Sequence, residues 1–130
     1  WGPGCLPGQS EKAGDKCNPG EVIPADLPSE MITAYLDAAS DPEMLRQIAP
    51  IYHLQYVTAP VQIHSGTADG AALAETPPEW AAAVYEALQS AGKEATLYTY
   101  SGQGHYFSGA DWTTMIARTA DFFDAELPSE

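Results

Sequence analysis

Two short β-prone segments, each followed by a helical pattern, constrain the fold of this chain most strongly. The segments are Val61–His64 and Ala95–Tyr100. A helix is predicted between them, from the Thr-Pro-Pro-Glu start at residues 76–79 to Gly92, and a last helix begins near Asp111. Strands that alternate with helices over short links are typical of a parallel sheet covered by helices. Two strands make too small a sheet to stand alone, so we expect the end of a larger α/β fold.

The first 41 residues differ in composition from the rest. Residues 1–29 contain five of the chain's 11 prolines and five of its 11 glycines, which predicts an irregular region. A short helix with Ser29 as its predicted cap follows. The sequence Asp41-Pro42-Glu43 is a second helix start, with a cap residue, a proline and an acid in the first turn. We therefore expect a Pro/Gly-rich excursion over residues 1–41 and an α/β segment over residues 42–130.

The chain has two cysteines, Cys5 and Cys17, and both lie in the Pro/Gly-rich region. We expect a disulfide between them, because a loop with few large apolar residues gains stability from a covalent link, about 3 kcal/mol in the chain-entropy account. Two free thiols in a reducing compartment are the alternative. A zinc site is not expected, since no histidine or further cysteine lies nearby. A disulfide implies an oxidising compartment, which predicts an extracellular or periplasmic location.

The charge of the chain bears on its partners. Lys and Arg number 5 against 18 Asp and Glu, which gives a net charge of −13. Such a field repels phosphate backbones and anionic lipids, so no nucleic-acid partner is expected. No apolar run approaches the roughly 20 residues of a membrane span, so we expect no membrane insertion by this chain. The chain opens on Trp1 without an initiator Met, which favours a processed or truncated product.

Two polar residues follow the two predicted strands directly. Asp69 lies in Gly-Thr-Ala-Asp-Gly after the first strand, and His105 lies in Gly-Gln-Gly-His after the second. Ligands gather at the carboxyl ends of parallel strands, and a right-handed crossover sets these strands parallel. We therefore predict that the Asp69 carboxylate bonds to the His105 imidazole, as in the base half of a nucleophile–His–acid triad. The simpler alternative for Asp69 is a turn-forming residue.

These segments carry a resemblance to a known family. Pro-Val-Gln-Ile-His-Ser-Gly-Thr-Ala-Asp at residues 60–69 resembles the Asp-bearing strand end of α/β-hydrolases of the prolyl oligopeptidase group. So do Ala-Gly-Lys-Glu at 91–94, the Gly-Gln-Gly-His motif and the closing Phe-Phe at 122–123. Dienelactone hydrolases and esterases share much of this pattern. The resemblance implies an α/β-hydrolase fold and a serine hydrolase, with Asp69 as the triad acid and His105 as the general base.

The sequence departs from that family in two ways. None of its serines lies in a Gly-x-Ser-x-Gly turn, so the nucleophile is missing from this chain. The run from Gly70 to Pro78 is also longer than the family's usual few residues between the Asp and a Val-Pro pair.

Other residues receive less specific predictions. Tyr106 and Phe107 follow the predicted base and are candidate substrate-binding residues. The histidines His53 and His64 are expected to be structural. The helix aromatics are expected to lie in the core, and they are Trp80, Tyr85, Trp112, Phe122 and Phe123.

The leading hypothesis is therefore the acid–base half of a secreted serine hydrolase that acts on peptide or ester bonds. No metal and no organic cofactor are implied. The expected partner is the remainder of the hydrolase fold or another protein subunit. The alternative is a non-catalytic structural or accessory subunit derived from a hydrolase and packed on a partner protein, which the missing nucleophile favours.

Overall fold

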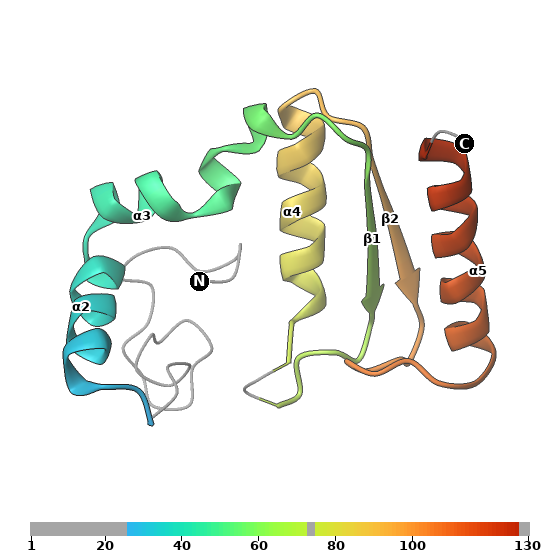
Figure 1. Ribbon diagram of the computed structural model, residues 1–130. Helices are drawn as coiled ribbons and strands as arrows, with labels where there is room; N and C mark the ends of the chain where they lie inside the picture. The colour runs from blue at the N-terminus through green and yellow to red at the C-terminus, as the bar shows by residue number, and fades with distance from the viewer. Residues whose placement is uncertain (1–25, 73–74, 128–130) are drawn as a thin grey trace.

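The computed structural model describes residues 26–72 and 75–127 and consists of helices around a small sheet (Figure 1). In chain order, the elements are the α-helices α2 (Ser29–Ser40) and α3 (Pro42–Ile48), the 3₁₀ turns η1 (Pro50–Tyr52) and η2 (Leu54–Tyr56), the strand β1 (Val61–Gly66), the helix α4 (Pro78–Ser90), the strand β2 (Ala95–Tyr100) and the helix α5 (Gly109–Glu126).

The sheet has the predicted parallel arrangement. β1 pairs with β2 in a register that runs from Val61 opposite Ala95 to Gly66 opposite Tyr100. α4 is the crossover between the two strands and lies on one face of the sheet, while α5 lies on the other (Figure 1). Both strands point the same way, so the loops that follow them emerge at the same end of the sheet, the carboxyl end, where the predicted site residues lie.

Local sequence signals explain where two of the helices begin or end. The Asp41 side chain accepts a hydrogen bond from the Glu43 backbone N–H at 2.9 Å and so caps α3, as predicted. At the end of α4, Gly92 has φ +68°, and its N–H donates to Gln89 O at 3.0 Å while Lys93 N–H donates to Leu88 O at 2.9 Å. This pair of bonds is a Schellman motif, which confirms Gly92 as the predicted stop.

Two predicted boundaries are corrected. Ser29 does not cap α2; it is the first helical residue, Pro28 takes the cap position, and no side-chain cap bond forms. α5 begins at Gly109, two residues before the predicted Asp111, and this first residue has φ +61°, a left-handed conformation that glycine adopts without steric cost.

Little of the described chain forms a closed core. Among the described residues, Leu45, Leu88 and Tyr100 are the large buried apolar side chains, and Pro77 is also buried. Trp112 and Phe123, which were expected in the core, are each 50% exposed, because α5 packs on the sheet with one face only and nothing in the described chain covers the rest. This pattern is that of a portion of a larger fold rather than of a complete domain.

Several predictions lie outside what the structure describes. Cys5 and Cys17 fall in residues 1–25, so the disulfide and the compartment inferred from it stay predictions. The division between residues 41 and 42 also stays a prediction; the helix on its N-terminal side, α2, contacts α3 on the other side. Within the described residues, no helix is long and apolar enough to cross a membrane.

Candidate functional site

The loops after β1 and β2 are bonded directly to each other. Thr67 N–H donates to Tyr100 O at 2.9 Å, and Ala68 N–H donates to Gln103 O at 2.9 Å. In return, Gly102 N–H donates to the Thr67 hydroxyl at 2.9 Å. Three hydrogen bonds within a few residues continue the pairing of the strands beyond the sheet, so the two loops have one fixed relative position.

Gly66, the last residue of β1, permits this close approach. A Cβ at Gly66 would overlap the Gln103 carbonyl oxygen and would lie 2.7 Å from Gly104 O. Real side chains do not come so close to a backbone oxygen, so only glycine fits at this position. The sequence marks Gly66 as the end of a strand but does not reveal that the second loop lies against it.

Asp69 and His105 meet across the two bonded loops. His105 Nδ1 lies 3.1 Å from Asp69 Oδ2 and 3.2 Å from Oδ1, which confirms the predicted contact between them. The Asp69 side chain is 10% exposed and that of His105 is 35% exposed. Because an ionised carboxylate only accepts hydrogen bonds, Nδ1 carries the proton, and Nε2 of the neutral ring is left with its lone pair. Among the described residues, no serine hydroxyl bonds to His105.

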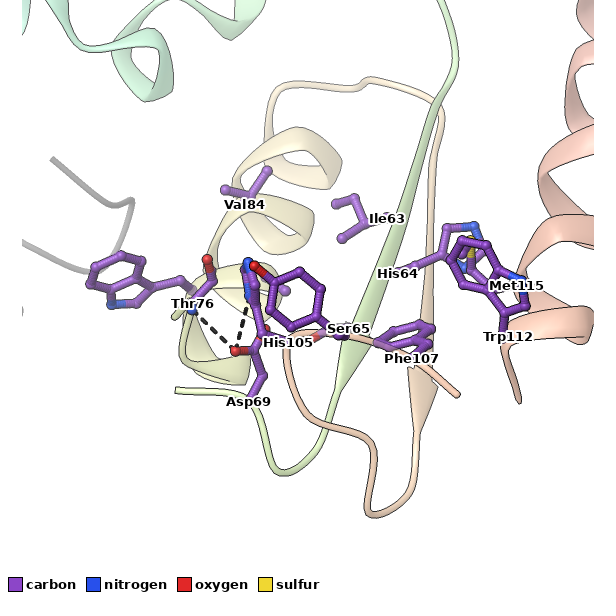
Figure 2. A pocket seen from close by; sticks show the side chains of 13 residues that line it. Ile63, His64, Ser65, Asp69, Thr76, Val84, His105, Phe107, Trp112 and Met115 are labelled. Atoms are coloured by element: carbon purple, nitrogen blue, oxygen red, sulfur yellow. Dashed lines mark hydrogen bonds and ion pairs between the residues drawn. The ribbon is translucent and has the colours of Figure 1, made fainter. Parts of the chain in front are cut away.

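The long segment after Asp69 returns to the same carboxylate. Asp69 Oδ1 accepts a hydrogen bond from Gly70 N–H at 2.7 Å. It also accepts one from Thr76 N–H at 3.1 Å, which Figure 2 shows as a dashed line. Gly70 has φ +93°, which turns the chain sharply away from the strand. The segment after Asp69 therefore supplies a second backbone donor, Thr76 N–H, to the carboxylate. Sequence reasoning missed Thr76, because its contribution comes from the backbone and leaves no side-chain signal.

A hollow of about 550 Å³ opens beside the Asp69–His105 pair. Tyr106 and Phe107 both line it; Tyr106 is 86% exposed, and the Phe107 ring packs on the Tyr100 ring at 4.7 Å between centroids. Their role in binding substrate stays a prediction. The remaining lining is mostly apolar and consists of Ile63, His64, Ser65, Thr76, Trp80, Ala81, Val84, Trp112 and Met115.

The hollow has an unusual position relative to the sheet. Side chains of successive strand residues point to opposite faces, yet Ile63 and His64 both line it. Figure 2 shows Ile63 and Val84 on the α4 side of β1, and His64 and Trp112 on the α5 side. In the described part of the chain, β1 pairs with β2 alone, so its other edge is unpaired. We infer that the hollow passes around that unpaired edge.

A second polar cluster joins β1, β2 and α5. His64 Nε2 lies 2.7 Å from Gln62 Oε1, and Nδ1 lies 2.8 Å from the Tyr100 hydroxyl. Arg118 donates to the same hydroxyl at 3.3 Å, and its guanidinium lies 4.1 Å from the centre of the Tyr98 ring. Burial and the positive charge of Arg118 lower the pKa of His64 below its ordinary value of 6.5.

His64 is therefore hydrogen-bonded within the fold, as expected of a structural histidine, and it also lines the hollow. His53 also has a structural contact, since its Nε2 lies 2.9 Å from Gln47 O. No group of three or more His, Cys, Asp and Glu side chains suited to a metal ion occurs among the described residues.

The parallel strands, the crossover helix and the Asp–His pair at the strand ends define this chain as the C-terminal portion of an α/β-hydrolase. Its sequence matches the profile of the prolyl oligopeptidase family over residues 26–130, and the chain belongs to that family. No curated protein sequence matches the chain.

Solved structures show the same fold. The chain resembles a thermophilic esterase from the planctomycete Thermogutta terrifontis with butyrate bound, at 21% identity and a TM-score of 0.52, over 85% of this chain and 41% of the esterase. The propionate-bound form of that esterase matches at 22% identity and a TM-score of 0.52, over 85% of this chain and 40% of the other. The chain thus spans about two fifths of the length of these structures.

Proposed function

We propose that this chain supplies the acid and the base of a serine hydrolase that cleaves peptide or ester bonds. The observation that carries the proposal is the Asp69–His105 contact at 3.1 Å, which leaves Nε2 of His105 with a lone pair beside an apolar hollow. Membership of the prolyl oligopeptidase family supports hydrolase chemistry. The esterase of the same fold supports an ester as an alternative substrate to a peptide.

In the proposed reaction, a serine hydroxyl attacks the scissile carbonyl while His105 Nε2 takes the hydroxyl proton. The imidazolium then gives this proton to the leaving group, and the acyl–serine bond is cleaved by water with His105 as the base again. Asp69 fixes the Nδ1–H tautomer and stabilises the imidazolium. Its own position is fixed by the backbone N–H groups of Gly70 and Thr76.

We further propose that the serine belongs to another part of the hydrolase fold that packs beside β1. At the start of β1, Val61 N–H donates to Glu94 O at 3.0 Å, and directly after its end Thr67 N–H donates to Tyr100 O at 2.9 Å. Because parallel bonding alternates along a strand, Gln62 and His64 direct their backbone groups to the unpaired edge. A strand paired there fills the hollow that passes around this edge and reaches the same end of the sheet as His105.

The test uses the natural protein that contains these residues, expressed with and without substitutions, and measures its labelling by a fluorophosphonate probe and its turnover of an ester substrate. Asp69→Asn is expected to lower turnover about 10⁴-fold, since it favours the wrong imidazole tautomer, and His105→Gln at least as much. Matched controls are Asp121→Asn, an exposed acid on α5, and His53→Gln, whose ring bonds to the Gln47 carbonyl and stacks on the Tyr56 ring away from the Asp69–His105 pair; both are expected to retain turnover.

The 130-residue chain on its own is expected neither to be labelled by the fluorophosphonate at a serine nor to hydrolyse the ester. Stoichiometric serine labelling of the chain would overturn the proposal that the nucleophilic serine lies outside these 130 residues. Full turnover by His105→Gln in the natural protein would overturn the assignment of the base and favour the non-catalytic subunit.

A further inference from the structure

The side chain of Gln103 connects the His105 loop to the start of α5. Its Nε2 donates to Asp111 Oδ2 at 2.9 Å, and its Oε1 accepts from Ser108 N–H at 3.0 Å. The orientation of the amide is unambiguous, because the carboxylate needs a donor and the N–H needs an acceptor. Ser108 holds the cap position of α5 but makes no side-chain cap bond, so Gln103 ties this helix end to the loop.

The backbone of Gln103 is hydrogen-bonded to the Asp69 loop. Its carbonyl oxygen accepts from Ala68 N–H at 2.9 Å, one residue before Asp69. The same oxygen lies against the bare Cα of Gly66. Gln103 therefore contacts the Asp69 loop through its backbone and α5 through its side chain, and it stands two residues before His105.

We propose that Gln103 is a positioning residue that holds the His105 ring against the Asp69 carboxylate. This inference rests on the proposed function of His105 as the base. Gln103 does not touch the reacting atoms. It acts by fixing the loop between Tyr100 and His105, where Gly102 with φ +75° and Gly104 provide no side chains to restrain the backbone. Without the amide bonds, the loop keeps its bonds to the Asp69 loop and the bond from Gln103 N–H to Tyr100 O at 3.3 Å, but it loses its link to the start of α5.

The pairing of an amide with a carboxylate allows a reciprocal exchange as a test. Gln103→Glu places two carboxylates about 2.9 Å apart and removes the donor to Asp111. Asp111→Asn alone keeps the bond, because an amide oxygen also accepts from Gln103. The double variant Gln103→Glu with Asp111→Asn restores one bond in the opposite direction, and the introduced carboxylate still accepts from Ser108 N–H. Gln103→Leu removes both bonds without a change of charge.

The readout is the tautomer of His105 in the ¹⁵N-labelled protein, measured by NMR from the shifts of the two ring nitrogens above the pKa of the ring. The unaltered protein is expected to hold His105 as the Nδ1–H form, bonded to Asp69. In Gln103→Leu and Gln103→Glu, the ratio of Nδ1–H to Nε2–H is expected to fall about tenfold, the ratio that one hydrogen bond of ordinary strength maintains. The double variant is expected to recover the ratio of the unaltered protein, and Asp111→Asn alone is expected to keep it.

The control is Gln89→Glu, which also exchanges an amide for a carboxylate and loses a side-chain bond, here the one to Ala95 O at 3.2 Å at the far end of the sheet. It leaves the His105 tautomer unchanged. A Gln103 variant that melts earlier but keeps the ratio overturns the positioning role, and so does a double variant that fails to recover it. If Gln103→Leu does not fold, the comparison of Gln103→Glu with the double variant Gln103→Glu and Asp111→Asn still tests the positioning role. If His105 of the unaltered protein is not the Nδ1–H form, the proposed acid–base pair itself is wrong.

Discussion

At the scale of single residues, the site depends on backbone groups more than on side chains. Asp69 accepts two backbone N–H bonds in addition to its contact with His105, and the two loops are joined by three further bonds that involve backbone atoms. A carboxylate that accepts several fixed donors has one orientation. The geometry of the pair is therefore expected to be sensitive to changes that move the backbone and tolerant of exposed side-chain changes.

Gly66→Ala is expected to destabilise the chain by about 2 kcal/mol, because the new methyl group forces the Gln103 loop away from β1. Gly104→Ala is the matched control: nothing lies within 4 Å of a Cβ at Gly104, so its unfolding free energy changes by less than about 0.5 kcal/mol. Urea unfolding of both variants measures the difference. Equal stability of the two variants would contradict the close approach at Gly66.

The lowered pKa of His64 predicts a pH dependence of stability. The folded chain favours the neutral form of His64, between the Tyr100 hydroxyl, Gln62 and the Arg118 cation, and so lowers its pKa below the ordinary 6.5 of the unfolded chain. The unfolded state therefore binds more protons as the pH falls below 6.5. The contribution of neutral His64 is fully present above this pH and is lost as the pH falls toward the lower folded pKa.

Urea unfolding between pH 5 and pH 8 tests this dependence, at values chosen about the ordinary histidine pKa. His64→Gln is expected to flatten the pH profile of unfolding, whereas His53→Gln keeps the slope of the unaltered chain. A slope that persists in His64→Gln would assign the dependence to another group.

At the scale of elements, local signals suffice for the order and type of the helices and strands. The proline–acid start of α3, the Gly92 stop of α4 and the β-prone segments are all found where the sequence places them. The Asp69–His105 contact could also be predicted, since parallel strands with a helical crossover bring their following loops together. These features depend on neighbours in sequence or on topology alone.

The remaining features depend on contacts that no local pattern records. Periodicity indicates that Trp112 and Phe123 belong to an apolar helix, but it does not indicate what covers them, and both are half exposed. The bonds from Thr76 and Ala68 involve backbone N–H groups, which every residue except proline has. The Gln103 bridge joins residues whose types are common in loops.

The end of α4 offers a test at this scale. Gly92→Ala is expected to cost about 1 kcal/mol, because alanine is strained at φ +68° although nothing lies within 4 Å of its Cβ. Gly92→Asn is expected to cost less, since asparagine tolerates the left-handed region better. Thermal or urea unfolding ranks the two variants, and an asparagine variant less stable than the alanine variant would contradict a cost from backbone strain.

At the scale of the whole molecule, apolar surface and net charge oppose each other. On one side of α5 and at its C-cap lie four apolar side chains that are 46–62% exposed, namely Trp112, Ile116, Phe123 and Leu127. An exposed stripe of this kind favours association, whereas a net charge of −13 opposes it.

The 130-residue chain is therefore expected to associate with increasing salt. A rise from about 0.01 M to about 1 M shortens the Debye length from about 30 Å to about 3 Å and removes most of the repulsion between copies. Light scattering should show the mass increase with salt, and Ile116→Ser should weaken the increase. A monomer at every salt concentration would show that the exposed stripe does not drive association.

The return of the chain from Gly70 to Thr76 has a consequence for protein engineering. Both residues donate to one oxygen of Asp69, so the intervening segment starts and finishes at the same anchor beside the hollow. Foreign peptides grafted between these two anchors would be displayed at the mouth of the site while the Asp69 carboxylate keeps both of its donors. Under the proposed hydrolase function, a library of grafts at this position would vary the surface beside the hollow without a change to Asp69 or His105.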